Sequence, residues 1–308
     1  MHNQLITKHW IHIVLAAALL AVVLSACGQQ GDTPTPTAVQ SEATTAATPE
    51  ELRPTETEAP LAARVNGEGI SQDEFGAELL RLQDAQAELQ KTSTPEEQHQ
   101  QAMDELIDQV LLAQAAYTNG FELDDAALQA RIDQLAEQAG GAGELESWQN
   151  ANHYTPESFR AALARQAAAA WQRDRLVDSV AESGEQIHAR QILLLSRETA
   201  DAIYNQLQSG VDFSLLANQY DPQTGGELGW FPRGYLLQPA VEEAAFALQP
   251  NQYSQVIETP IGFHIVQVIE RGDHVYAPDV RHMLQEQALT GWLDEQRSQG
   301  QIEILLPD

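Results

Sequence analysis

The stretch Gln255-Val-Ile-Glu-Thr-Pro-Ile-Gly-Phe-His-Ile-Val-Gln-Val-Ile-Glu270 decides the fold of the C-terminal half of this 308-residue chain. Residues 263–270 are mostly apolar and residues 255–258 contain Val256 and Ile257, whereas Thr259-Pro-Ile-Gly262 between them contains the proline and glycine that turns favour. Two apolar runs on either side of a short turn predict a pair of antiparallel strands. We therefore expect a β-sheet in this half of the chain.

Further strands and helices are predicted on the N-terminal side of this hairpin. An apolar run predicts a strand over 187–195, and a second, shorter strand is expected over 228–231. Apolar residues at i, i+3 and i+4 predict helices over 198–208, 212–220 and 239–248. The order strand, two helices, strand, helix, two strands is typical of an α+β domain.

Residues 61–183 have the pattern of a helical domain. Alternating apolar residues predict a short strand over 61–65, and Asn66-Gly67 then supplies a turn. Thr94-Pro-Glu-Glu97 combines an N-cap, a proline at the first helical position and a capping-box glutamate, so a helix is expected to begin there. A long alanine-rich helix is expected from Pro156. This region of the sequence contains no cluster of metal ligands or nucleophiles.

The last part of the chain, residues 274–308, is expected to return to the helical domain. An amphipathic helix is predicted from Pro278 to about Ser298. Apolar residues then alternate over 302–306, and we expect this strand to pair near residues 61–65. The helical domain would then be built from two separate parts of the chain.

The first 27 residues have the layout of a secretory signal peptide. The apolar run over 10–24 is short for a membrane-spanning helix. Leu24-Ser-Ala-Cys27 resembles a bacterial lipobox, in which Cys27 becomes the lipidated first residue of the mature chain. An ordinary signal peptide with an incidental cysteine and an uncleaved anchor remain alternatives. Residues 28–60 are rich in Thr, Pro, Ala and Glu, which predicts a disordered tether.

Charge and cysteine content exclude several classes of partner and site. The formal net charge of −29 argues against nucleic acid as a partner, because little in the chain can neutralise phosphate. The same charge would favour basic or unfolded clients at low salt, and the simpler alternative is that it only keeps an acidic protein soluble. Cys27 is the only cysteine, so neither an intramolecular disulfide nor a cysteine-based metal site can form.

Five ordered blocks in the C-terminal half resemble parvulin-type peptidyl-prolyl isomerases. The blocks are Ile187–Leu195, Val211–Tyr220, Gly225-Gly-Glu-Leu-Gly-Trp-Phe231, Glu242–Pro250 and Thr259-Pro-Ile-Gly-Phe-His-Ile-Val266. The resemblance implies a parvulin domain over 184–273, with a four-stranded antiparallel sheet and surrounding helices. The opening of region 61–183 and its helix around Leu106 resemble the all-helical chaperone domain of PrsA-like and SurA-like foldases. The fold class expected for the whole chain is therefore α+β.

The resemblance to parvulins also implies a site. His188 and His264 match the paired histidines at the pocket floor, Thr259 matches the threonine linked to them, and Asp221 matches a position that carries Asp or Cys. The proline ring would be held by Leu237, Val241 and Phe246, with Gln238 at the rim of the pocket. A structural interpretation stays open, because histidines and apolar side chains also occur in cores, and an aspartate before proline can begin a turn.

Rotation about an X–Pro bond needs no covalent intermediate, so neither a cofactor nor a metal is expected. The resemblance implies a peptidyl-prolyl cis-trans isomerase and chaperone. Its clients would be unfolded or partly folded exported proteins that contain X–Pro bonds. The lipid on Cys27 would anchor it to the outer face of the bacterial cell membrane.

Two departures from the parvulin pattern favour a different class of function. The loop 221–224 is shorter than usual in parvulins, and Val241 stands where an aromatic residue is common. These departures favour a non-enzymatic holdase chaperone with a degenerate parvulin domain. No basic cluster follows the strand 187–195, which argues against selectivity for phosphoserine–proline. A metal- or solute-binding lipoprotein is disfavoured, because the histidines outside the parvulin blocks have no ligand spacing.

Overall fold

The computed structural model describes residues 60–306 and divides the chain into two compact units. The first unit consists of the residues up to Asp174 together with Trp292–Asp308, and the second consists of Arg175–Gly291. The predicted signal peptide, Cys27 and residues 28–59 of the predicted tether lie outside the described residues. Within residues 60–306, no helix combines the length and the apolar composition that crossing a membrane requires.

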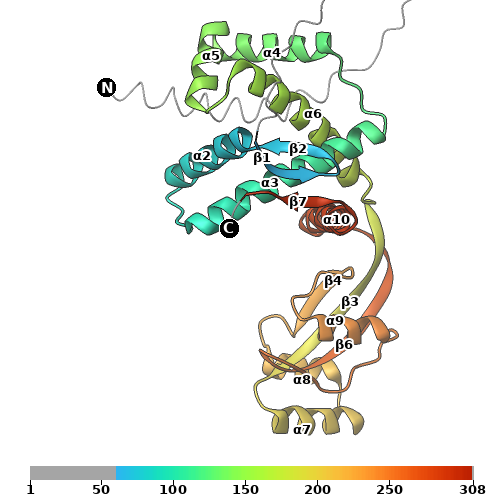
Figure 1. The fold of residues 1–308 in the computed structure, drawn as a ribbon. Coiled ribbons are helices and arrows are strands. Elements are labelled where there is room, and N and C mark those ends of the chain that lie inside the picture. The colour runs from blue at the N-terminus through green and yellow to red at the C-terminus, as the bar shows by residue number, and fades with distance from the viewer. Residues whose placement is uncertain (1–59, 307–308) are drawn as a thin grey trace, which may run out of the picture. The chain divides into compact units, whose positions relative to one another are not determined.

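The first unit is mainly helical and contains one small sheet. Its elements are β1 (Leu61–Val65), β2 (Glu68–Ser71), α2 (Gln72–Glu88), α3 (Pro95–Thr118), α4 (Asp125–Ala139), α5 (Ala142–Ala151), most of α6 (Pro156–Asp178), the end of α10 (Pro278–Gln299) and β7 (Ile302–Ile304) (Figure 1). The sheet has the strand order β2-β1-β7, and both pairs are antiparallel. Ala63 faces Ile304, so the last strand lies beside the first (Figure 1).

Local sequence signals account for the turn and the helix start in this unit. Asn66 and Gly67 both have positive φ, 51° and 89°, as a two-residue hairpin of type I′ requires. Thr94 and Glu97 form the reciprocal hydrogen bonds of a capping box at the start of α3. The predicted turn and helix start are confirmed.

The two largest apolar clusters of the first unit account for most of its core. The larger one packs one face of α3 against β1, β2 and α2, and its large side chains include Val65, Ile70, Phe75, Met103, Leu106, Ile107 and Val110. The smaller one joins α4, α5 and α6 through Leu128, Leu135, Leu145, Phe159 and Leu163. Burial of one such side chain contributes about 1.5–3 kcal/mol, so the clusters carry more stability than any cap.

The second unit is an α+β domain built on one sheet. Its elements are β3 (Ser183–Leu194), α7 (Arg197–Gln208), α8 (Phe213–Tyr220), β4 (Glu227–Phe231), α9 (Pro239–Ala247), β5 (Ile257–Thr259) and β6 (Gly262–Val275), followed by the first part of α10. The strand order is β4-β3-β6-β5, and every neighbouring pair is antiparallel. The predicted four-stranded antiparallel sheet with surrounding helices, and the α+β class, are confirmed.

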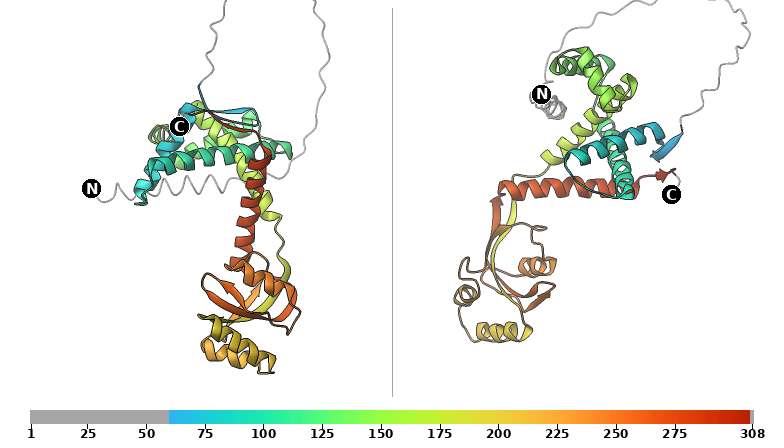
Figure 2. Two further views of the ribbon diagram at one scale, coloured as in Figure 1. Left: turned by 60° about the horizontal axis from the view of Figure 1, so that its bottom comes forward. Right: turned by 90° about the vertical axis from the view of Figure 1, so that its left-hand side faces the viewer.

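β3 and β6 are longer than the apolar runs that predicted them. They pair from Ser183 opposite Val275 to Leu194 opposite Phe263, and both views in Figure 2 show them side by side. The added residues, 183–186 and 271–275, are largely polar. Because no apolar alternation marks them, only their pairing with each other reveals that they are strands.

The two faces of this sheet carry different cores. Ile192, Leu194 and Ile265 pack with α7 and α8, whereas Val266 and Val268 pack with α9. Successive residues of a strand point to opposite faces, so His264, next to Ile265, belongs to the face that α9 covers. The pocket described below lies on that face.

Candidate active site

His264 lies at the centre of a polar chain in the sheet. It sits near the start of β6 and is 1% exposed. Its Nε2 is 2.9 Å from Thr259 Oγ1, and its Nδ1 is 2.8 Å from Gln191 Oε1. Because the side-chain oxygen Oε1 of Gln191 faces the ring, the Nδ1–H of His264 donates to it. The other ring nitrogen, Nε2, then accepts from the Thr259 hydroxyl.

The β5–β6 hairpin holds this chain in place. The Thr259 hydroxyl oxygen also lies 3.2 Å from the Gly262 carbonyl oxygen, and it accepts from the Ile261 N–H at 3.3 Å. Gly262 has φ 144°, and a Cβ there would stand 2.6 Å from the Leu194 carbonyl oxygen. Only glycine permits so close an approach of the turn to β3, and this approach keeps Thr259 beside His264.

Burial sets the charge of the imidazole. Removal of His264 from water lowers its pKa, because the charged form loses hydration and no carboxylate replaces it. The ring is therefore neutral at pH 7. A neutral imidazole with both nitrogens hydrogen-bonded is a fixed dipole within the pocket wall.

An apolar pocket of about 500 Å³ opens over Gln191 and His264. Its apolar lining consists of Leu228, Tyr235, Leu236, Leu237, Val241 and Ile261. Gln238, which precedes the first residue of α9, also lines the pocket. A polar chain beneath a recess with apolar walls can hold a proline ring while facing the amide before it.

The Glu242 carboxylate fixes one wall of the pocket. Its oxygens accept the backbone N–H groups of Gly234, Tyr235 and Leu236 at 2.7, 3.0 and 3.0 Å. Three charge-assisted bonds from one α9 side chain hold the loop that supplies Tyr235 and Leu236.

His188 is not a partner of His264, and the predicted pairing of the two histidines is wrong. His188 lies opposite Glu270 in β6, six residues beyond His264, which corresponds to roughly 20 Å along a strand. Its ring stacks on Trp230 with centroids 5.4 Å apart, and its Nε2 contacts the Glu227 carboxylate. His188 therefore lies outside the pocket.

Gln191 occupies the place that the prediction gave to His188. His264 faces Leu193 across the β3–β6 pair, and Gln191 lies two residues earlier on the same face of β3. The sequence signal for Gln191 is that a polar residue stands within a predicted apolar strand, directly before Ile-Leu-Leu-Leu195. Strand register, which the sequence does not show, decides that Gln191 reaches the ring.

The other predicted residues divide between the pocket and its surroundings. Thr259 contacts His264 as the resemblance implies. Val241, Leu237 and Gln238 line the pocket as expected; Val241 is 2% exposed, whereas Leu237 is 94% exposed and Leu236 is the one that packs into the apolar cluster. Phe246 is not among the lining residues; it is buried behind them, next to Phe231.

Asp221 makes its hydrogen bonds within its own turn and is not one of the hydrogen-bond partners of His264. Its carboxylate caps its own turn by accepting the N–H groups of Gln223 and Thr224 and the Thr224 hydroxyl. The hydroxyl is the main cause of the lowered pKa of Asp221, with backbone N–H groups adding to it. The turn-forming alternative accounts for these contacts, and the carboxylate lines a neighbouring recess rather than the proline pocket.

No cofactor or metal position emerges from the described side chains. Within residues 60–306, no group of three or more His, Cys, Asp or Glu side chains is arranged to hold a metal ion.

Comparison with known proteins agrees with the fold and the site. The family model for the PPIC-type PPIase domain matches residues 175–272, and the model for the SurA-like N-terminal domain matches residues 5–172. The second match covers more than half of the chain. The fold and these matches define a protein that joins a SurA-like helical domain to a parvulin-type domain.

Individual relatives are similar over different lengths. A foldase protein PrsA of Geobacillus sp. strain WCH70 is 28% identical over 64% of this chain and 75% of that protein. A PrsA of Caldanaerobacter subterraneus is 42% identical over 29% of this chain, and a chaperone SurA of Bordetella parapertussis is 35% identical over 38% of it. The last two matches span only 30% and 27% of the relatives' own lengths. The chain belongs to the family of PrsA/SurA-like foldase chaperones that carry a parvulin domain.

Proposed function

We propose that this protein is an active peptidyl-prolyl cis-trans isomerase and chaperone for exported proteins. The observation that carries the proposal is the hydrogen-bonded Thr259–His264–Gln191 chain, in which His264 is buried, beneath an apolar pocket able to take a proline ring. The foldase and chaperone names of the relatives support unfolded or partly folded clients with X–Pro bonds.

The pocket supplies what bond rotation needs. A planar X–Pro amide is stabilised by resonance, which separates charge between nitrogen and oxygen; a twisted amide loses that resonance and separates less charge. Apolar walls such as Leu228 and Val241 disfavour the charge-separated planar form. Hydrogen-bonding groups at the His264 wall add stabilisation where they fit the twisted amide better than the planar one. Neither effect uses a covalent intermediate.

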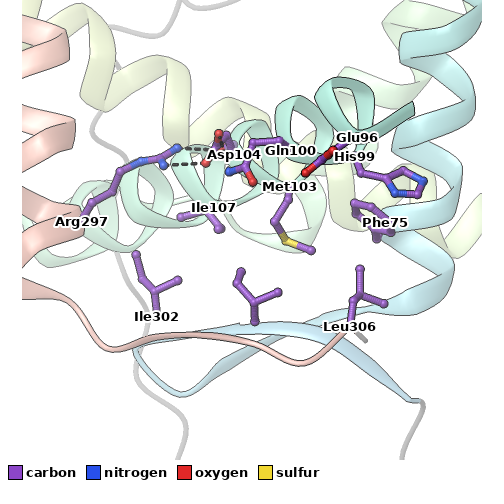
Figure 3. A pocket seen from close by; sticks show the side chains of 11 residues that line it. Phe75, Glu96, His99, Gln100, Met103, Asp104, Ile107, Arg297, Ile302 and Leu306 are labelled. Atoms are coloured by element: carbon purple, nitrogen blue, oxygen red, sulfur yellow. Dashed lines mark hydrogen bonds and ion pairs between the residues drawn. The ribbon is translucent and has the colours of Figure 1, made fainter. Parts of the chain in front are cut away.

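The helical unit supports a chaperone role through an apolar groove. We define the groove by Phe75, Met103, Ile107, Ile302, Ile304 and Leu306, around a space of about 920 Å³. Figure 3 shows Met103, Ile302 and Leu306 directed into this space, with Arg297 paired to Asp104 at one side. Such a groove would bind apolar segments of a client and keep them from aggregating.

The second candidate function is a holdase without isomerase activity. The observation that favours it is Gln191, because the resemblance implies a histidine beside His264 and this chain supplies an amide instead. The groove would then carry the chaperone activity, and the parvulin domain would bind proline-containing segments without accelerating their isomerisation.

A protease-coupled assay on prolyl tetrapeptides separates these two functions. The wild type is expected to accelerate isomerisation, and the effect should disappear in His264→Ala. An absence of acceleration by the wild type would reject the isomerase, whereas suppression of client aggregation would then support the holdase.

We propose that the protein acts outside the cytoplasmic membrane, anchored to its outer face by a lipid on Cys27. The motif Leu24-Ser-Ala-Cys27 and the PrsA relatives support this location. Labelled palmitate should enter the wild type and not Cys27→Ser; equal labelling of both would refute the anchor.

The division of the chain that accompanies this proposal has five parts. They are a signal peptide over 1–27, a tether over 28–60, a helical chaperone domain over 61–183, a parvulin domain over 184–273 and a returning segment over 274–308.

A further inference from the structure

A second recess adjoins the proline pocket and shares one wall with it. The recess has a volume of about 360 Å³, and the side that faces the proline pocket is formed by Gln191, which lines both. It lies where the end of β3 passes the turn that follows α8. The two spaces therefore meet at Gln191.

Large apolar side chains stand exposed around this recess. Leu195 is 89% exposed, and Leu193 and Tyr220 are each 39% exposed. All three line the recess. Leaving a leucine in water forgoes about 1.5–3 kcal/mol of burial, so a ligand that covers Leu195 gains apolar contact.

The charged groups of the recess are all negative. Asp221 and Glu227 lie in its wall, and none of its described lining residues is basic. Two cations lie near these lining residues along the chain: Arg190 donates to the Gln267 side chain, and Arg197 is engaged by Asp201 and Glu258. An acidic side chain placed here would meet like charge without a counter-ion.

We propose that this recess receives the side chain that precedes proline in the client, and that it selects large apolar residues over acidic or phosphorylated ones. The inference rests on the proposed isomerase function and names its substrate class. When the proline ring fills the apolar pocket, the X–Pro amide lies at the polar wall that Gln191 shares with His264. The residue before proline then reaches the far side of Gln191, where the recess begins.

The test is a panel of prolyl tetrapeptides that differ only in the residue before proline: Leu, Phe, Ala, Glu and phosphoserine. We expect kcat/KM for Leu and Phe to exceed that for Glu and phosphoserine by roughly tenfold or more, as expected when a recess without counter-ions must hold a charge. Equal values across the panel, or a preference for the acidic peptides, would overturn the inference and leave the isomerase intact.

A matched pair of variants locates the selectivity. Leu195→Lys is expected to reduce kcat/KM for the Leu peptide and raise it for the Glu peptide, each by roughly three- to tenfold. Leu215→Lys makes the same change at a leucine of α8 that is 68% exposed and lies outside the recess, and it should leave the ratio unchanged. An unchanged ratio in Leu195→Lys would refute the assignment.

A binding measurement separates this inference from the isomerase proposal. Methyl signals of Leu193 and Leu195 should shift on titration with the Leu peptide and not with the Glu peptide. If the wild type turns over no peptide yet shows these shifts, the assignment of the recess is supported and the proposed isomerase activity is refuted. If it turns over peptides without shifts at either leucine, the recess is wrong.

Discussion

The proline pocket of the second unit and the groove of the first are both apolar, but they differ in where their polar groups lie. In the pocket, His264 is 1% exposed and hydrogen-bonded through both ring nitrogens. At one side of the groove, Arg297 is ion-paired, 2.7 Å from both Asp104 and Asp108. Hydrogen bonds to Asp108 and then Asp104 raise the pKa of Arg297 further above its usual range.

Under the proposed function, the pocket acts on the X–Pro bond and the groove binds apolar client segments. The His264 imidazole is a buried dipole that must be oriented toward one amide bond. Its orientation depends on Gln191, and so on the register of β3 against β6. The groove would bind mainly through its apolar area, although Glu96, His99 and Gln100 also line it. The two regions should therefore respond to mutation independently, and the predictions below test that separation.

The largest expected effect is on the pocket. His264→Ala should lower kcat/KM for prolyl peptides by roughly a hundredfold or more, as loss of one oriented group at a reacting amide commonly does. Suppression of client aggregation by the groove should persist. Both are measured on the same preparation, by the protease-coupled assay and by light scattering of an unfolding client.

His188→Ala is the matched control for that variant. His188 contacts Trp230 and Glu227 and lies outside the pocket, so its loss should change kcat/KM by less than about twofold. Equal losses in the two variants would show that His264 has no special role.

The next effect in size is on the groove. Ile304 is 54% exposed, and its side chain lines the groove from β7. Ile304→Asp should weaken client capture by roughly two- to fivefold, which corresponds to about 0.5–1 kcal/mol of lost apolar contact. Isomerase activity should not change. Leu305→Asp alters the adjacent residue, which is 46% exposed and lies outside the groove, so it should have no effect on capture; if it weakens capture equally, the groove is not the binding surface.

The same comparison explains which features could be predicted from sequence. The four strands of the second unit and the capping box at Thr94 were predictable, because periodicity and caps are local signals. Thr259 beside His264 was expected from the resemblance to parvulins, and the contact is local because both residues belong to one hairpin. The partner of His264 was not, because Gln191 meets it only through the register of β3 against β6. Leu236 and Leu237 are adjacent leucines, and only the path of their loop decides which one packs inward.

A smaller effect follows from the pH dependence of His264. Burial depresses the folded-state pKa below the ordinary value of 6.5, so the folded protein binds this proton less readily than the unfolded chain. The resulting stability is present above pH 6.5 and is lost as the pH falls through the depressed pKa. Urea denaturation of the second unit should show this loss, and His264→Gln should reduce it. A pH response that is the same in both proteins would assign the effect to other groups.

The smallest effect concerns the helix that lines the groove. Thr94→Ala removes the N-cap of α3 and should destabilise the first unit by about 1 kcal/mol. Because α3 carries Met103 and Ile107, client capture should weaken on warming before isomerase activity does. Calorimetry should show a lower first-unit transition and an unchanged second-unit transition. Thr92→Ala, a change in the same loop but outside the cap, is the control and should shift neither. If Thr94→Ala lowers both transitions together, the two units unfold as one, and the independence inferred from comparing pocket and groove fails.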